Sequence, residues 1–78
     1  MNVIVYSAVW CPWCHKTKEF LKENNIEFEE RDIENTEGAA EEVIKKSGQK
    51  GIPVTDVEGT IIVGYDKEAL KKALNIGG

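Results

Sequence analysis

The chain has 78 residues, with 14 Asp or Glu against 10 Lys or Arg, which gives a formal net charge of −4 at pH 7. A chain of this length builds one small core that buries only about 60% of the unfolded surface, so we expect residues 1–78 to form a single domain. The acidic balance argues against nucleic-acid binding, because nucleic-acid-binding faces usually carry clustered basic residues, and we expect a monomer that binds neither nucleic acid nor membrane.

The first half of the chain is expected to form a βαβ unit. Residues 2–7, NVIVYS, are rich in β-branched and aromatic side chains, which is typical of a strand. Residues 13–24 show helical spacing, with apolar side chains on one face and lysines, Lys18 among them, on the other. Residues 26–33, IEFEERDI, follow as a second strand with Glu30 on the same face as its apolar residues. Two strands joined by a helix in this way run parallel.

A second helix is expected between this strand and residue 47. Asn35 or Thr36 can cap its N-terminus, because either side chain can accept a hydrogen bond from the first turn. Its predicted apolar stripe consists of residues at helical spacing, namely Ala40, Val43 and Ile44. Its predicted solvent-facing side consists of charged residues, namely Glu41, Glu42, Lys45 and Lys46. Gly48 is suited to end the helix.

The last third of the chain predicts a hairpin followed by a helix. Residues 54–57 and 60–63 read as two antiparallel strands, joined by the turn at residues 58–59, where glycine accepts a positive φ. Asp66 is suited to cap a last helix, whose end is expected to fray at residues 77–78. The predicted element order is therefore β-α-β-α-β-β-α.

Both cysteines and the only histidine lie in residues 8–17, AVWCPWCHKT. The pattern C-x-x-C-H fits a redox dithiol, part of a zinc site, or covalent haem attachment. A structural zinc site needs four ligands, and a haem protein needs a large cavity and a second axial ligand. No basic residues precede the apolar opening, so we expect no signal peptide and a cytoplasmic protein, in which thiols serve redox chemistry or metals more often than structural disulfides. These observations favour a redox dithiol without a metal.

The predicted elements bring both thiols to the start of a helix. Cys11 follows the first strand and Cys14 lies in the first helical turn, a spacing that permits a disulfide between them. Free N–H groups and the positive end of the helix dipole stabilise a thiolate, which is the nucleophilic form. We therefore expect Cys11, the more exposed thiol, to attack a substrate disulfide and Cys14 to resolve the mixed disulfide. Pro12 suits the first helical position.

Three segments carry a family resemblance. YSAVWCPWCHKTK contains C-P-W-C-H, KKSGQKGIPV contains an x-P step before the hairpin, and VGYD contains G-x-D before the last helix. In this order they resemble the motifs C-P-Y-C-H, T-V-P and G-G-x-D of the glutaredoxin-like proteins of the thioredoxin superfamily. The resemblance implies an α/β thioredoxin fold, with a four-stranded mixed sheet of order 4-3-1-2 and helices on both faces.

The resemblance also implies a substrate-binding surface. Its expected residues come from three segments and are Pro12, Trp13, Ile52, Pro53, Gly64, Tyr65 and Asp66. A cis bond before Pro53 would present the backbone of Ile52 to a cysteine-containing chain. Asp66 would bind the γ-glutamyl amine of glutathione in addition to capping the helix. Trp13 is expected either to form a groove wall or to cover the core, whereas Trp10 is expected to cover the core.

The activity implied is that of a small dithiol oxidoreductase, which reduces protein disulfides or glutathione mixed disulfides without a bound cofactor. Glutathione is then a possible co-substrate, and the expected protein substrates are of the peroxiredoxin or ribonucleotide reductase type. The electron donor is either glutathione or a flavoprotein similar to thioredoxin reductase. An alternative implied by the same family is an iron–sulfur cluster carrier, in which two subunits hold the cluster with Cys11 and glutathione.

Three positions depart from the glutathione-using pattern. Ala8 stands where such proteins commonly place a lysine, Gly51 replaces the threonine of T-V-P, and Val63 replaces the first glycine of G-G-x-D. Loss of one exposed charge contact weakens binding by about 1 kcal/mol. These substitutions predict a preference for protein partners over glutathione.

Overall fold

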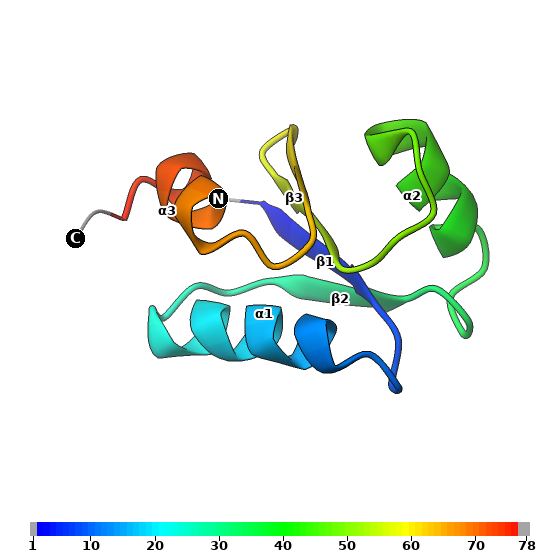
Figure 1. The fold of residues 1–78 in the computed structure, drawn as a ribbon, viewed down its shortest axis with the longest axis horizontal. Coiled ribbons are helices and arrows are strands. Elements are labelled where there is room, and N and C mark those ends of the chain that lie inside the picture. The colour runs from blue at the N-terminus through cyan, green and yellow to red at the C-terminus, as the bar shows by residue number, and fades with distance from the viewer. Residues whose placement is uncertain (1, 77–78) are drawn as a thin grey trace.

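The computed structural model describes residues 2–76 and contains three helices and four strands (Figure 1). In chain order these elements are β1 (Val3–Ser7), α1 (Pro12–Glu23), β2 (Glu29–Asp32), α2 (Ala39–Ser47), β3 (Val54–Val57), β4 (Thr60–Val63) and α3 (Lys67–Leu74). The order matches the prediction from the sequence. The expected fraying at residues 77–78 lies outside the described residues.

The four strands form one mixed sheet in the order β2-β1-β3-β4. Strand β1 pairs parallel with β2 and antiparallel with β3, and β4 pairs antiparallel with β3. The turn between β3 and β4 has positive φ at both Glu58 (52°) and Gly59 (95°), as a two-residue type I′ hairpin requires. The predicted sheet order and hairpin are therefore confirmed.

Alternation along the strands divides the core between the two faces of the sheet. On one face, Val3 and Val5 of β1 pack with apolar residues of α1 and α3. On the other face, Tyr6 of β1 and Val54 of β3 pack with Ala39 and Val43 of α2. The helices therefore cover both faces, as predicted, with α1 and α3 on one side and α2 on the other (Figure 1).

The second strand is shorter than predicted, because the chain before it completes the end of α1. Asn25 adopts a left-handed φ of 58°, and the N–H of Ile26 donates to the carbonyl of Leu21 at 2.9 Å. This is the bond that closes a Schellman-type helix end, so the backbone of Ile26 does not join the sheet. Ile26 and Phe28 precede the strand and pack against the core beside α1 and α3.

The second helix begins later than predicted, and neither Asn35 nor Thr36 caps it. The Asp32 carboxylate accepts the N–H groups of Glu34 and Asn35, and the Asp32 carbonyl accepts that of Thr36 at 2.8 Å, so these residues form a turn. The N-cap is Gly38, with a φ of 81° and no side-chain cap bond.

The face that α2 buries also differs from the prediction. Ala39 and Val43 are buried, whereas Ala40 and Ile44 are exposed. The cause is the Tyr6 hydroxyl, which donates to Glu42 at 2.5 Å and accepts from Lys46 at 2.8 Å. The face predicted to meet solvent therefore includes two side chains that bind the sheet.

Candidate active site

The two cysteines lie at the junction of β1 and α1. Cys11 is the N-cap of α1, and its Sγ accepts the backbone N–H of Cys14 at 3.2 Å. Pro12 occupies the first helical position, where a missing N–H costs nothing. Upstream, the N–H of Cys11 donates to the carbonyl of Ala8 at 3.1 Å and closes a turn. The hydrogen bond from the Cys14 N–H and the positive end of the helix dipole both favour negative charge on the Cys11 sulfur.

Both thiols are free and buried, with Cys11 4% exposed and Cys14 fully enclosed. Cys11 is thus the more exposed of the two residues, as predicted, although both are nearly enclosed, because Ile33 and Ile52 pack against the cluster of Ala8, Cys11 and Cys14. Burial, reinforced by hydrogen bonding to Cys11, raises the pKa of Cys14 to about 12. Near neutral pH, Cys14 therefore keeps its proton.

An open groove of about 300 Å³ lies beside the cysteines and is lined by five of the predicted substrate-binding residues. These are Trp13, Ile52, Pro53, Gly64 and Tyr65. The Ile52-Pro53 peptide bond is cis, and the N–H of Gly64 donates to the carbonyl of Pro53 at 2.7 Å, which joins the two loops. The rings of Trp13 and Tyr65 stack with centroids 6.1 Å apart. Trp13, 56% exposed, is therefore a wall of the groove.

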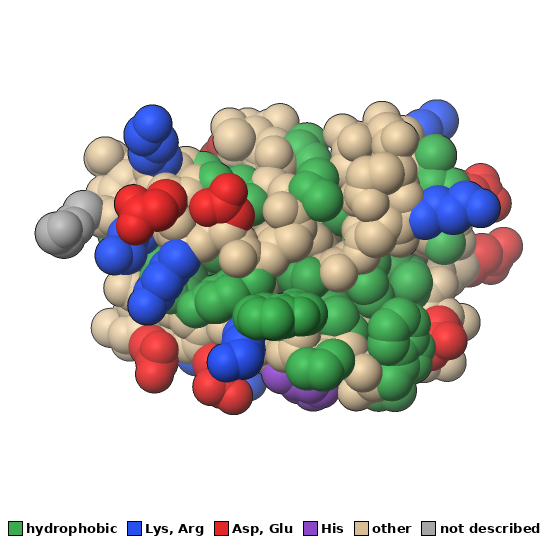
Figure 2. Space-filling view, viewed as in Figure 1, with side chains coloured by type: hydrophobic (Ala, Val, Ile, Leu, Met, Phe, Trp, Pro, Cys, Tyr) green, Lys and Arg blue, Asp and Glu red, His purple; other side chains and the backbone are tan. Residues whose placement is uncertain are grey.

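Apolar side chains continue beyond this groove on the same side of the molecule. Figure 2 shows hydrophobic side chains gathered above α1 and around its N-terminal end. Trp10 is 61% exposed and Val9 is 72% exposed, so the prediction that Trp10 covers the core is wrong. Both residues occupy the centre of the turn that the Ala8–Cys11 hydrogen bond closes, and the ring of His15 lies 3.2 Å from the carbonyl oxygen of Val9.

Of the predicted substrate-binding residues, Pro12 and Asp66 do not line the groove, and neither does Ala8. Asp66 is exposed, and its Oδ1 accepts the N–H of Ala69 at 3.1 Å, which confirms its role as the N-cap of α3. Ala8 is 1% exposed and packs beside both thiols. A side chain at this position points into the cysteine cluster, so a lysine there would have to leave the cluster to reach a ligand.

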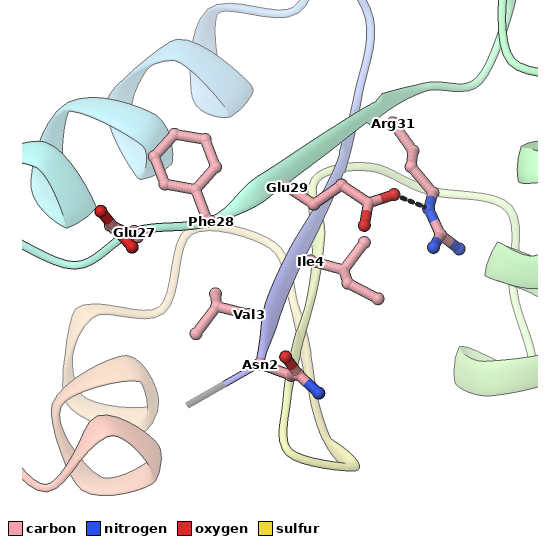
Figure 3. Close-up of a pocket in the computed structure, with 7 residues that line it drawn as sticks. All are labelled: Asn2, Val3, Ile4, Glu27, Phe28, Glu29 and Arg31. Atoms are coloured by element: carbon pink, nitrogen blue, oxygen red, sulfur yellow. Dashed lines mark hydrogen bonds and ion pairs between the residues drawn. The ribbon is translucent and has the colours of Figure 1, made fainter.

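A larger pocket, of about 490 Å³, lies at the opposite end of β1 from Cys11 (Figure 3). It is lined by Asn2, Val3, Ile4, Glu27, Phe28, Glu29 and Arg31. Within it, Arg31 already pairs with Glu29 at 2.5 Å, and the lining side chains include no thiol or imidazole. The two cysteines and the histidine thus lie outside this pocket. Within residues 2–76, no three His, Cys, Asp or Glu side chains are placed to share a metal ion.

A charged pair near the thiols was not anticipated from the sequence. Lys18 was predicted to face solvent, but its Nζ lies 2.6 Å from Glu30 Oε2 and its side chain is only 14% exposed. Ser7, which is fully buried, donates to the same oxygen at 2.8 Å. The hydrogen bond from Lys18 is the main cause that holds the pKa of Glu30 below its usual value. The sequence did contain one indication that Lys18 lies near the thiols, because it follows Cys14 by one helical turn.

Comparison with known proteins identifies relatives over most of the chain. The glutaredoxin family model matches residues 3–62. An uncharacterized glutaredoxin-like 8.6 kDa protein in the rubredoxin operon of Clostridium pasteurianum is 41% identical over 70 residues, covering 90% of this chain and 93% of that protein. Glutaredoxin 3 of Escherichia coli K12 is 34% identical over 65 residues, covering 83% and 78%. The crystal structure of a glutaredoxin from Archaeoglobus fulgidus superposes with a TM-score of 0.85 at 34% identity, covering 92% and 84%.

Proposed function

Because this chain belongs to the glutaredoxin family, we propose that it is a thiol–disulfide oxidoreductase in which Cys11 is the nucleophile and Cys14 the resolving thiol. The observation that carries the proposal is the asymmetry of the two sulfurs. Cys11 Sγ receives an N–H hydrogen bond at the helix N-terminus, whereas Cys14 is enclosed and burial raises its pKa to about 12. The first sulfur is suited to attack, and the second is protected from reaction with external disulfides.

The reaction proceeds in two exchanges. Cys11 thiolate attacks one sulfur of a substrate disulfide, forms a mixed disulfide and releases the other substrate sulfur as a thiol. Cys14 then attacks Cys11 Sγ, which forms the Cys11–Cys14 disulfide and releases the second substrate thiol. An external two-electron donor returns the pair to the dithiol. The short sequence spacing lets this cycle run with little movement of the backbone.

The groove supports binding of an extended, cysteine-containing segment. Trp13 and Tyr65 offer apolar faces, and the loop at Ile52-Pro53 supplies backbone groups beside the thiol cluster. Val9 and Trp10 are exposed in the turn that directly precedes Cys11, so they add apolar surface next to it. A surface of this kind suits a folded protein better than a small polar tripeptide.

We therefore propose protein disulfides as the preferred substrates and a flavoprotein similar to thioredoxin reductase as the preferred donor. Three departures from the glutathione-using pattern support this preference: Ala8, Gly51 and Val63. Ala8 is buried, so it offers no ligand contact. Substrates of the peroxiredoxin or ribonucleotide reductase type, whose catalytic disulfides need external reduction, fit the proposal.

The test uses two single variants and a protein disulfide. With insulin as substrate and dithiothreitol as reductant, we expect Cys11→Ser to abolish catalysis, because no thiolate remains at the helix N-terminus. In a separate reaction of the reduced protein with insulin and no dithiothreitol, Cys14→Ser should still attack but should accumulate a mixed disulfide with the substrate, visible as a mass increase that later addition of dithiothreitol reverses. Full activity of Cys11→Ser would contradict the proposal. Equal trapping through either cysteine would contradict the assignment of roles.

A further inference from the structure

Lys18 differs from the neighbouring lysines of α1 in its burial and its partner. Lys16 and Lys22 are exposed, whereas the Lys18 side chain is 14% exposed and its Nζ lies 2.6 Å from Glu30 Oε2. Ser7 Oγ binds the same carboxylate at 2.8 Å. The Lys18 side chain therefore packs between α1 and the two parallel strands, and its ammonium group is held by a carboxylate that is 44% exposed.

This fixed charge lies close to the resolving thiol. Lys18 follows Cys14 by four residues in α1, so the two side chains share one face of the helix. Ser7, which donates a hydrogen bond to Glu30, directly precedes Ala8, and Ala8 packs against both cysteines. The ion pair is thus next to the cysteine cluster along both the helix and the strand.

The apolar side chains around Cys14 disfavour negative charge on its sulfur. Ala8, Ile33 and Ile52 pack on the cluster, and these side chains carry no charge. The titratable groups near Cys14 are Cys11 and Lys18 of α1, with Glu30 and Asp32 of β2 acting on Lys18 in turn. Burial and Cys11 raise the pKa of Cys14, whereas a hydrogen bond with the Ala8 backbone and, more weakly, the charge of Lys18 lower it.

We propose that Lys18 is a positioning residue for the resolving step: its ammonium group stabilises the negative charge on Cys14 as that sulfur attacks Cys11, and Glu30 partly neutralises this effect. The proposal rests on the function proposed above. In the step, Cys14 loses its proton, its sulfur bonds to Cys11 Sγ, and the bond between Cys11 and the substrate sulfur breaks. The bonding electrons leave with the substrate sulfur, which takes up one proton, so no further oxidant or reductant is needed.

The proposal predicts opposite effects for the two members of one ion pair. Lys18→Met removes the stabilising charge and should slow resolution. Glu30→Gln keeps an oxygen that can accept from Lys18 and Ser7 but removes the neutralising carboxylate, so it should accelerate resolution. A pair that only supports the fold would give effects of the same sign, because either change breaks the ion pair.

The experiment is a stopped-flow reaction of the reduced protein with 5,5′-dithiobis(2-nitrobenzoate), followed at neutral pH by release of thionitrobenzoate. The first release reports attack by Cys11 and depends on reagent concentration. The second reports displacement by Cys14 and does not depend on it. Loss of the Lys18 charge lowers the thiolate fraction of Cys14, and a higher nucleophilicity of the sulfur offsets part of this loss, so we expect Lys18→Met to slow the second phase about two- to threefold. The first phase should change less than the second.

The controls are Lys22→Met, an exposed lysine one turn further along α1, and Lys18→Arg, which retains the charge. Both should keep the second-phase rate close to that of the wild type. The effect of Lys18→Met should shrink as the pH rises and Cys14 ionises more completely. If Lys18→Met does not fold, the faster second phase of Glu30→Gln remains the decisive observation.

Two outcomes distinguish this proposal from the function on which it rests. If the first phase is absent in the wild type, Cys11 is not the nucleophile and the proposed function fails. If both phases occur but Lys18→Met and Glu30→Gln change the second phase in the same direction, or leave its pH profile unchanged, the role of Lys18 is overturned while the proposed function stands.

Discussion

At the scale of single residues, the two cysteines occupy the different places that the sequence predicted, with Cys11 at the N-cap of α1 and Cys14 inside its first turn. Their spacing, the proline between them and the helix that follows were sufficient to predict that they share a helix N-terminus. Their burial was not predictable in the same way, because Ile33 and Ile52 reach Cys11 and Cys14 from distant parts of the chain. The residue types and the spacing of the motif thus indicated thiol–disulfide chemistry, whereas the packing of distant residues determines how far each sulfur is buried.

The exposure of the two tryptophans was also not predictable from the sequence. Trp10 and Trp13 are both large apolar residues beside the motif, and a small core would benefit from burying either one. Trp10, however, occupies the centre of the Ala8–Cys11 turn, and Trp13 faces the groove, so both are more than half exposed. An exposed pair of indole rings at a reactive site indicates binding, because soluble proteins rarely expose such surface without use.

Replacement of Trp10 tests whether this surface recognises proteins. We expect Trp10→Ser to raise KM for a thioredoxin reductase-like flavoprotein about 5- to 30-fold, corresponding to about 1–2 kcal/mol, because aromatic side chains dominate protein interfaces. Reduction of the oxidised protein by glutathione should change by less than about twofold, because a small thiol does not need this contact. Steady-state assays with each donor, side by side, measure both effects.

The matched control is Ile44→Ser on α2, an apolar residue that is 44% exposed and far from the motif in sequence. It should leave both donor reactions unchanged. The preference for proteins would be wrong if wild-type protein turned over rapidly and saturably with physiological glutathione and poorly with every protein reductase. It would also be wrong if Trp10→Ser slowed both donors equally.

At the scale of secondary-structure elements, the sequence located every helix and strand but not every boundary. The hairpin strands and the cap at Asp66 were predictable, because turn glycine and N-cap chemistry are local. The start of α2 and the start of β2 were not, because Asp32 and Ile26 use their hydrogen-bonding groups in turns that compete with the expected elements. The buried face of α2 was shifted by a long-range partner, the Tyr6 hydroxyl.

The polar contact between α2 and the sheet gives a pH-dependent prediction. Lys46 lies 2.7 Å from Asp56 Oδ2 on β3, and the Asp56 side chain is 13% exposed. Burial alone would raise the pKa of Asp56, but hydrogen bonds from Lys46 and Gly59 hold it below the usual value of 3.8. The unfolded chain therefore binds a proton at higher pH than the folded chain, so this stabilisation is present at neutral pH and is lost as the pH falls below about 4.

Asp56→Asn should consequently lower the free energy of unfolding by about 1–2 kcal/mol at pH 7, because the ion pair with Lys46 is lost while an oxygen remains for Gly59. The difference from wild type should shrink toward zero near pH 3, where the wild-type carboxyl is itself protonated. Urea unfolding of the reduced protein at both pH values measures this. Glu41→Gln, an exposed acid on α2, is the control, and an equal loss in that variant, or a pH-independent loss in Asp56→Asn, would contradict the account.

At the scale of the whole molecule, the order of elements was sufficient to predict the sheet. A right-handed βαβ unit followed by a hairpin and a helix permits few arrangements, and the observed order β2-β1-β3-β4 is the one expected. The fold brings residues 11–14, 52–53 and 64–65, which are distant in sequence, to one groove beside the thiols. The family motifs indicated this convergence, but the open apolar flank at Val9 and Trp10 emerged only from the structure.

The proposed function requires that Cys11 and Cys14 form one reversible redox pair that serves as a reductant. A redox titration tests it most directly: the wild-type protein is equilibrated in glutathione buffers of defined potential, quenched with an alkylating reagent and weighed by mass spectrometry. We expect a single two-electron transition between the dithiol and the intramolecular disulfide, with a midpoint reduction potential between roughly −270 and −200 mV. Thiols that stay alkylatable across the whole range, or a midpoint near −120 mV, the value of a strong oxidant, would contradict it.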